Sequence, residues 1–228
     1  IIGSDIGLKR AENQDRVAVL RMKFENNKSF LIAALSDVIG GMTEGAECAS
    51  QTIANFFIEC IHLRNSPTPE LLSLAASAAN QKIYSKFNGH GGATLSCVIF
   101  ESNGSSLGLN VGDSRIYSYS QNLLKQVTVD DTIAGQLNKN EELNPTMSKL
   151  IQFIGLGEGL EPHVIKLPTS NEIIFITSDG IHFLENKLME TVIRNVTENS
   201  KAAIRLIELS KWCGGHDNAS LIIASSPI

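Results

Sequence analysis

The chain has 228 residues, of which 43% are hydrophobic and 19% are charged, and its formal net charge is -5 at pH 7. This length can bury a substantial core, and we expect a single domain over residues 1–228. The negative charge argues against sequence-independent binding to nucleic acid, and no apolar run approaches the roughly 18 residues that a membrane span needs.

Four cysteines lie far apart without a Cys-x-x-Cys pair. This spacing is typical neither of a zinc site nor of a disulfide framework, so we expect a reducing, cytoplasmic setting. The sequence starts at Ile1 without a charged segment followed by an apolar one. We therefore expect no signal peptide, and a domain excised from a longer protein.

The first third of the chain predicts two antiparallel strands followed by two helices. Residues 16–21 read as a strand, residues 23–28 as a polar hairpin, and residues 30–35 as a buried strand. Apolar residues then recur at helical spacing over residues 44–60 and again over residues 72–87, after a Pro-Thr-Pro break. The two amphipathic helices need a sheet to cover their apolar faces.

The rest of the chain predicts more strands and then more helices. We expect a four-strand meander that supplies much of a second sheet, at residues 93–100, 107–110, 115–120 and 123–127. Short helices are expected within residues 130–154, followed by strands at 164–167 and 173–178, helices from about 184 and over 201–212, and a last strand at 220–224. Because strands and helices do not alternate as βαβ units, the prediction is an α+β fold, a four-layer αββα sandwich of two antiparallel sheets flanked by helix pairs.

Three acidic residues lie at the ends of predicted strands. Asp37 follows the strand at 30–35, Asp179 follows the strand at 173–178, and Asp217 precedes the last strand. Carboxylates gathered at one rim repel one another unless cations neutralise them. No Lys or Arg lies within four residues of any of the three, so the pattern favours metal, and oxygen ligands favour Mg²⁺ or Mn²⁺ over zinc.

Seven short motifs, in order along nearly the whole chain, resemble the metal-dependent type 2C Ser/Thr protein phosphatases of bacterial type. The motifs are Gly7-Leu8-Lys9-Arg10 with Asn13-Gln14-Asp15, Leu35-Ser36-Asp37 with Gly40-Gly41, Gly92-Ala93-Thr94-Leu95, Val111-Gly112-Asp113-Ser114-Arg115-Ile116-Tyr117, Val127-Thr128-Val129-Asp130, Thr177-Ser178-Asp179-Gly180 and Asp217-Asn218. The resemblance implies hydrolysis of phosphomonoesters on proteins, with a Ser/Thr kinase or its targets as partners. Such a reaction needs charge neutralisation and an activated water, which two divalent ions can supply.

The resemblance also implies roles for individual residues. Asp37 would bridge the two ions and Asp179 and Asp217 would complete the first site. The carbonyl of Val38 would serve the second ion, with help from Asp15. Arg10 would clamp the phosphate. The remaining acids of the motifs divide into Asp130, a candidate for a weaker third ion, and Asp113, which is expected to shape its turn; His216 is expected near the site without binding the metal.

Several positions depart from the family pattern. Val38 and Phe183 replace a usual glycine and a usual aspartate, Gln14 replaces an acid of the animal members, and Asp131 and Ile39 stand where histidines occur in relatives. A β-branched residue is strained at positive φ, so we expect Val38 to weaken the second metal site. These departures leave an alternative open, a catalytically weak or inactive phosphatase-fold module that binds phosphoproteins or regulates signalling.

Overall fold

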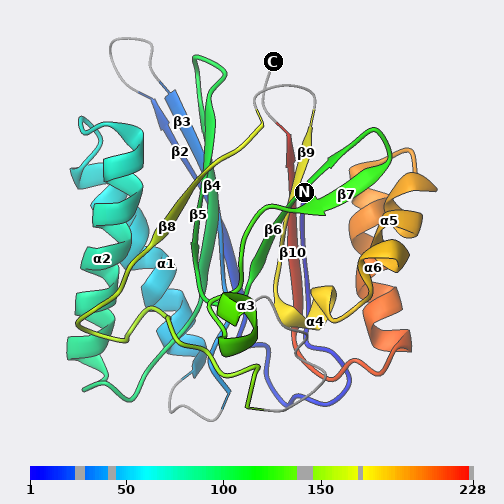
Figure 1. Cartoon of the computed structure of the whole chain (residues 1–228), viewed down its shortest axis with the longest axis horizontal. Coiled ribbons are helices and arrows are strands. Elements are labelled where there is room, and N and C mark those ends of the chain that lie inside the picture. The colour runs from blue at the N-terminus through cyan, green and yellow to red at the C-terminus, as the bar shows by residue number, and fades with distance from the viewer. Residues whose placement is uncertain (24–28, 41–44, 138–145, 169–171, 226–228) are drawn as a thin grey trace.

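Two five-stranded sheets, each antiparallel throughout, pack face to face in the computed structural model (Figure 1). The structure describes all residues except 24–28, 41–44, 138–145, 169–171 and 226–228. The sheet that contains β3, here the β3 sheet, has the order β2 (Arg16–Lys23), β3 (Ser29–Ser36), β4 (Leu95–Glu101), β5 (Ser106–Val111), β8 (His163–Lys166). The β9 sheet has the order β1 (Ile2–Asp5), β10 (Ala219–Ser225), β9 (Ile173–Thr177), β6 (Arg115–Ser120), β7 (Leu123–Gln126).

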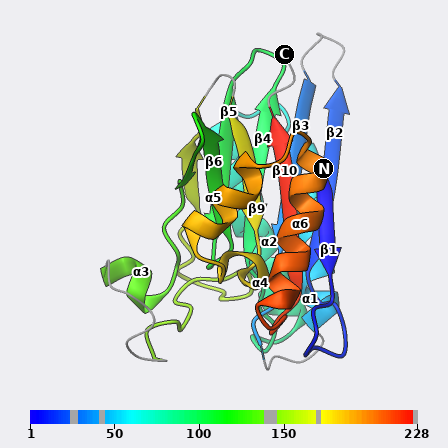
Figure 2. The ribbon, with the colours of Figure 1, turned by 90° about the vertical axis from the view of Figure 1, so that its right-hand side faces the viewer.

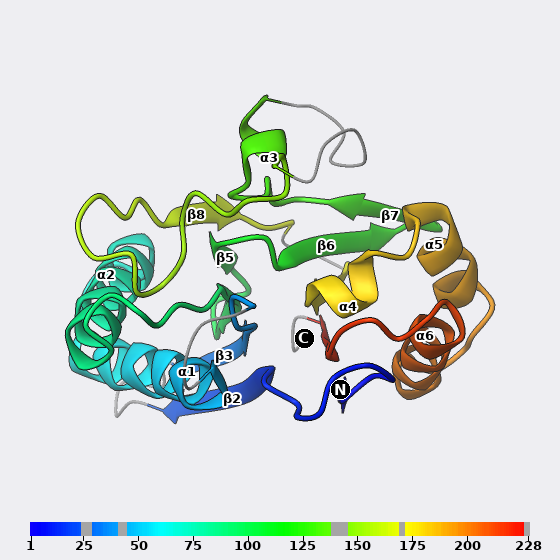
Figure 3. The same cartoon turned by 90° about the horizontal axis from the view of Figure 1, so that it is seen from below.

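Helix pairs cover the two outer faces of this sandwich, as the view in Figure 3 shows. The helices α1 (Gly45–His62) and α2 (Thr68–Lys86) lie on the β3 sheet, and α5 (Asn186–Arg194) and α6 (Asn199–Trp212) lie on the β9 sheet. Two short helices, α3 (Ile133–Leu137) and α4 (Asp179–His182), lie at one end of the sandwich, and α3 projects away from its layers (Figure 2). The predicted α+β sandwich is confirmed.

Strand β3 shows why the sequence makes four layers. Its side chains alternate between two cores: Phe30, Ile32 and Ala34 pack under α1 and α2, whereas Leu31, Ala33 and Leu35 pack between the sheets. A strand buried on both faces reads as the continuous apolar run that the sequence has at this position. A third core, between the β9 sheet and the helices α5 and α6, completes the stack.

The predicted four-strand meander is wrong as a single sheet. The pairs β4–β5 and β6–β7 form as expected, but β5 does not pair with β6, and the two hairpins lie in opposite sheets. The turn Gly112-Asp113-Ser114 is therefore the crossover between the sheets. The sequence analysis also missed β1, which pairs with β10, and the one-turn helix α4. Residues 24–28 of its predicted hairpin, and the Gly41 of its Gly-Gly pair, lie outside the described residues, and Lys23 ends β2.

The ends of β3, β5 and β9 and the starts of β6 and β10 meet at one end of the sandwich. In the register of the sheets, Thr177 of β9 is opposite both Arg115 and Leu221, and Leu95 is opposite Val111. The residues that follow β3 and β9, and those that precede β6 and β10, are consequently brought to one rim. None of the helices in the described ranges is both long and apolar enough to cross a lipid bilayer.

Candidate active site

A pocket of about 480 Å³ opens at this rim, between the ends of the two sheets. Four of its lining residues are acids, here called the acidic floor: Asp37, Asp113, Asp179 and Asp217. Residues 148–150 and 153, from the chain after α3, also line it, and the segment that carries them is here called the wall. The lining residues are Arg10, Asp37, Val38, Ile39, Gly40, Thr94, Asp113, Ser148, Lys149, Leu150, Phe153, Asp179 and Asp217. Of the residues assigned from the sequence, Arg10, Asp37, Val38, Asp179 and Asp217 thus share one cavity.

Thr94 fixes the backbone of Asp37. The Asp37 amide donates to Thr94 Oγ1 (2.9 Å), and the Thr94 amide donates to the Asp37 carbonyl (2.7 Å). Thr94 Oγ1 also lies 2.8 Å from Ser114 Oγ, so the same hydroxyl joins the loop after β3 to the crossover turn. The backbone that carries the Asp37 carboxyl is therefore held by a short hydrogen-bonded ladder.

Asp15 lies behind Asp37, buried and outside the pocket lining. Its Oδ2 accepts a hydrogen bond from Ser178 Oγ (2.8 Å), whereas its Oδ1 is buried and, within the described part of the chain, has no hydrogen-bond donor. Asp179 Oδ1 is likewise buried and has no hydrogen-bond donor among the described residues. Buried carboxylate oxygens without donors are costly, and a divalent cation would satisfy both.

The acids raise one another's pKa values. Burial, and then the charges of Asp15, Asp179 and Asp113, raise the pKa of Asp37 well above its ordinary value. Burial, followed by the charge of Asp217, raises the pKa of Asp179 to about 7, and burial likewise raises the pKa of Asp15. Raised pKa values mean that, without metal, the acids tend to keep protons near neutral pH. A divalent cation could replace these protons as the positive charge that the carboxylates need.

Asp217 is paired with Arg10 instead of with the other acids. Arg10 Nη2 donates to Asp217 Oδ2, and this hydrogen bond raises the pKa of the guanidinium, with further support from the charges of Asp179 and Asp37. In the described ranges, no three acidic, histidine or cysteine side chains surround one point as a finished ligand shell does. Two contacts account for this: Asp217 turns toward Arg10, and Asp15 and Asp37 face each other.

Asn218 ties the segment that carries Arg10 to the start of β10. Its Nδ2 donates to the carbonyls of Ile6 (2.9 Å) and Glu12 (3.0 Å), and its Oδ1 accepts from the Gln14 amide (2.9 Å). The sequence analysis used Asn218 only as part of a motif. The signal for its role was the adjacent Asp217, but its three partners are about 200 residues away in the chain.

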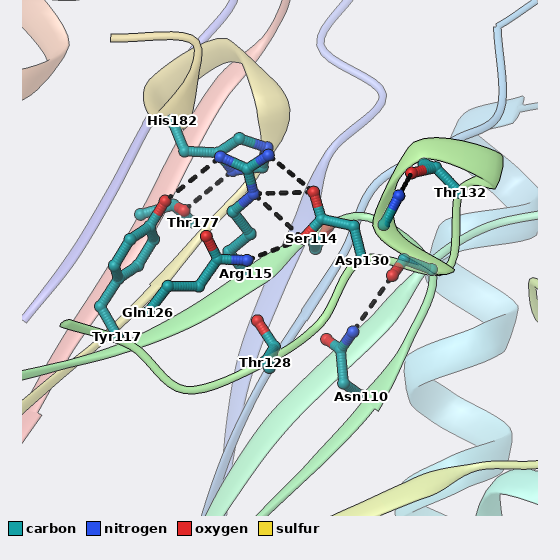
Figure 4. Close-up of polar contacts among 12 residues, drawn as sticks. Asn110, Ser114, Arg115, Tyr117, Gln126, Thr128, Asp130, Thr132, Thr177 and His182 are labelled. Atoms are coloured by element: carbon teal, nitrogen blue, oxygen red, sulfur yellow. Dashed lines mark hydrogen bonds and ion pairs between the residues drawn. The ribbon is translucent and has the colours of Figure 1, made fainter. Parts of the chain in front are cut away.

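Asp113 and Asp130 lie in different places from those that the sequence suggested: Asp113 lines the pocket and Asp130 does not. Asp113 lines the pocket, and its charge raises the pKa values of Asp37 and Asp179. Asp130 does not line the pocket; its carboxylate accepts hydrogen bonds from Arg115 Nε (2.9 Å) and Nη2 (2.6 Å) and from Gln126 Nε2 (2.9 Å) (Figure 4). In the described structure Arg115 and Gln126 thus satisfy the Asp130 carboxylate, and its assignment to a third ion stays a prediction.

The expected strain at Val38 is also absent. Among the described residues other than glycine, only Asn88, Gln121 and Asn122 have positive φ. Val38 bridges to Ala93 in a short antiparallel contact and packs against the core under α1. Phe183, where the family usually has an aspartate, does not line the pocket. Its ring contacts that of the exposed His216 edge to face, with centroids 6.3 Å apart.

Comparisons with known proteins agree with this geometry. No protein-family model matches the chain. It is 25% identical over 237 residues to a protein phosphatase of the 2C type from Streptococcus pyogenes, covering 96% of this chain and 94% of the relative. It is 29% identical over 240 residues to the Ser/Thr protein phosphatase PstP of Mycobacterium tuberculosis, covering 97% of this chain but only 43% of PstP. The crystal structure of the PstP catalytic domain with two manganese ions superposes with a TM-score of 0.80, covering 98% of this chain and 95% of that one at 26% identity.

Proposed function

We propose that this chain, a member of the bacterial type 2C (PPM) family of metal-dependent Ser/Thr phosphatases, hydrolyses phosphoserine and phosphothreonine esters on proteins. One observation carries the proposal: acids from both sheets converge with Arg10 on a single pocket, and two buried carboxylate oxygens, Asp179 Oδ1 of the pocket and Asp15 Oδ1 outside its lining, have no donor in the described structure. We take residues 1–228 as one phosphatase domain. Because the chain spans less than half of PstP, nothing of the rest of that protein is carried over.

Asp37, Asp179 and Asp217 are proposed to hold two Mg²⁺ or Mn²⁺ ions, with Asp15 and the Val38 carbonyl completing the second site. Bound divalent ions supply charge neutralisation of the phosphate and activation of water. Ser178 and Thr94 orient the acids, since each is hydrogen-bonded to one of them or to its backbone. Arg10 has a planar fork of donors suited to a phosphoryl group, and it would have to release Asp217 to bind one.

The proposed partners are phosphorylated proteins, with a Ser/Thr kinase or its targets among them. The described cysteines are free thiols, and Cys48, Cys60 and Cys97 are buried, so we propose a reducing compartment, the cytoplasm. Among the described residues, two observations speak against the inactive module: Val38 has no positive φ, and Asp37, Asp179 and Asp217 all line the pocket.

Turnover of a phosphothreonine peptide, measured with Mn²⁺ and again with EDTA, tests the proposal. We expect turnover only with metal, and its loss in Asp179→Asn, which removes a charged ligand at nearly constant volume. Asp5→Asn is the matched control, because Asp5 pairs with Lys211 outside the pocket. Metal-independent turnover, or full activity in folded Asp179→Asn, would contradict the mechanism.

A further inference from the structure

Two consecutive buried acids, Asp130 and Asp131, lie outside the proposed metal site and hold both flanks of the crossover turn. Asp130 is 6% exposed and Asp131 is fully buried. This turn, Gly112 to Arg115, contains Asp113, which lines the pocket. Buried carboxylates persist only where donors satisfy them, so the partners of these two acids show what they hold in place.

Asp130 anchors the later flank of the turn. Its carboxylate forms a two-sided ion pair with Arg115, and Gln126 donates to the same group (Figure 4). Arg115 Nη1 also lies within 3.5 Å of the buried Tyr117 hydroxyl. The residue two positions after Asp113 is thereby fixed at the start of β6.

Asp131 anchors the earlier flank and also reaches the opposite wall of the pocket. On one side, its Oδ2 accepts from the Gly112 amide (2.9 Å), and its own amide donates to the Gly112 carbonyl (3.0 Å). On the other side, its Oδ1 accepts from Gln152 Nε2 (3.2 Å) and from His163 Nε2 (2.9 Å), and its carbonyl accepts from the Ile151 amide (2.8 Å). A carboxylate only accepts, so this contact is a hydrogen bond in the tautomer that carries the proton on His163 Nε2.

The two sides of Asp131 belong to different parts of the pocket. Gly112 precedes Asp113 on the acidic floor, and Ile151 and Gln152 lie between the wall residues Leu150 and Phe153. Only glycine fits at position 112, because its φ is +104° and a Cβ there would lie 2.7 Å from Thr94 Cγ2. The acidic floor and the wall are thus joined through one residue, Asp131, by its side chain and its backbone.

We propose that Asp131 is a positioning residue that couples the wall formed by residues 150–153 to the Asp113 turn, so that a protein substrate seated on the wall is aligned with the acidic floor. This inference rests on the proposed phosphatase function. It concerns substrate alignment, because the wall is the part of the pocket that a phosphorylated peptide, larger than a phosphate, must contact. A small aryl phosphate needs the floor alone.

The experiment removes one side of Asp131 at a time. The double variant Gln152→Ala/His163→Phe loses both side-chain donors to Oδ1 and retains Asp131. We expect its KM for a phosphothreonine peptide to rise about tenfold, the scale of one charge-assisted hydrogen bond, while KM for p-nitrophenyl phosphate, kcat and the Mn²⁺ requirement stay unchanged. The single variant His163→Gln keeps native Gln152 and an N–H donor at position 163. Its KM for the phosphothreonine peptide should therefore stay close to that of the wild type. His62→Phe, an exposed histidine on α1, is the matched control.

Asp131→Asn should raise the peptide KM and also lower kcat, because an amide cannot accept on both sides and the Asp113 turn loses an anchor. Amide hydrogen exchange gives a readout that does not depend on activity: in Gln152→Ala/His163→Phe, the Gly112 amide should exchange at least about threefold faster, although neither substitution touches the turn. An unchanged Gly112 amide, or equal effects on both substrates, would overturn the coupling. An inactive wild type would overturn the proposed function alone.

Discussion

Arg10 is paired with Asp217, so a phosphate must compete with Asp217 for Arg10, and a metal must compete with Arg10 for Asp217. Within the described part of the chain the one ion pair of Arg10 is with Asp217, so it must release this acid to bind phosphate. Arg10→Ala should raise KM for a phosphopeptide about tenfold or more, the scale of lost charge-assisted hydrogen bonds, and should leave the Mn²⁺ concentration for half activation equal or lower, because Asp217 is freed. Steady-state kinetics over a Mn²⁺ series measure both quantities. Lys9→Ala is the neighbouring control, and an unchanged kcat/KM in Arg10→Ala would place Arg10 outside the reaction.

Val38 leads to the opposite prediction from the one that its sequence position suggested. Its φ is not positive, and a Cβ built on Gly45 of α1 would lie only 2.6 Å from Val38 Cγ1, so the side chain packs tightly on this helix. Val38→Gly should lower the free energy of unfolding by about 1–2 kcal/mol, through lost packing and a looser chain, without tightening Mn²⁺ binding. Urea unfolding and calorimetric Mn²⁺ titration measure the two effects. Tighter metal binding in the glycine variant would restore the idea that valine is a defect.

Among the elements, α2 holds the loop that follows the pocket wall. The buried Asn80 donates from Nδ2 to the Gly157 carbonyl (2.6 Å) and accepts from the amides of Gly155 (2.9 Å) and Gly157 (3.2 Å). Asn80→Ala would leave the buried amides of Gly155 and Gly157 without this acceptor and should cost about 1–3 kcal/mol of stability. Gln81→Ala is a matched control, since Gln81 bonds the same carbonyl from an exposed position and should cost less than about 0.5 kcal/mol. Equal losses in the two denaturant curves would show that Asn80 is not the anchor.

The sequence predicted the elements better than their partners. Apolar period and breakers located β3, α1, α2 and α6 within a few residues, because each of these elements buries a regular face. The crossover at Gly112 was misread because a Gly-Asp-Ser turn fits a hairpin and a change of sheet equally well; only long-range pairing decides between them. For the same reason Asp113 was taken as a turn residue and Asp130 as a ligand: the partner of Asp130, Arg115, is 15 positions away, and local sequence does not show that the two meet.

At the scale of the whole molecule, the pocket joins the two sheets. Asp37 follows a strand of the β3 sheet, whereas Asp179 and Asp217 adjoin strands of the β9 sheet. Repulsion among these acids acts across the contact between the sheets, and bound metal replaces it by attraction. Metal should therefore stabilise the fold as well as enable catalysis.

The pH dependence of this stabilisation has a definite sign. The pKa values of Asp15, Asp37 and Asp179 are raised above the ordinary 3.8, that of Asp179 to about 7. Between the unfolded and folded pKa values the folded chain holds more protons than the unfolded chain, so without metal the free energy of unfolding falls as pH rises through this range. Buried His182 acts in the opposite sense, because its pKa is well below 6.5, but it contributes equally with and without metal. The difference in unfolding free energy between Mn²⁺ and EDTA should therefore grow from about pH 5.5 to about pH 7.5.

Asp179→Asn isolates the source of this difference. In EDTA at about pH 7.5 the variant should be more stable than the wild type, on the order of 1–3 kcal/mol, because it removes a buried charge whose Oδ1 has no hydrogen-bond partner in the described structure. In saturating Mn²⁺ the order should reverse, because the variant has lost a metal ligand. Urea unfolding of both proteins at the two pH values, with and without Mn²⁺, gives all the required free energies, and Asp5→Asn controls for the loss of one negative charge elsewhere. A wild-type difference that does not change with pH, or an Asp179→Asn variant less stable than wild type in EDTA, would show that the acids do not repel one another across the sheets and that the cluster is not built for a cation.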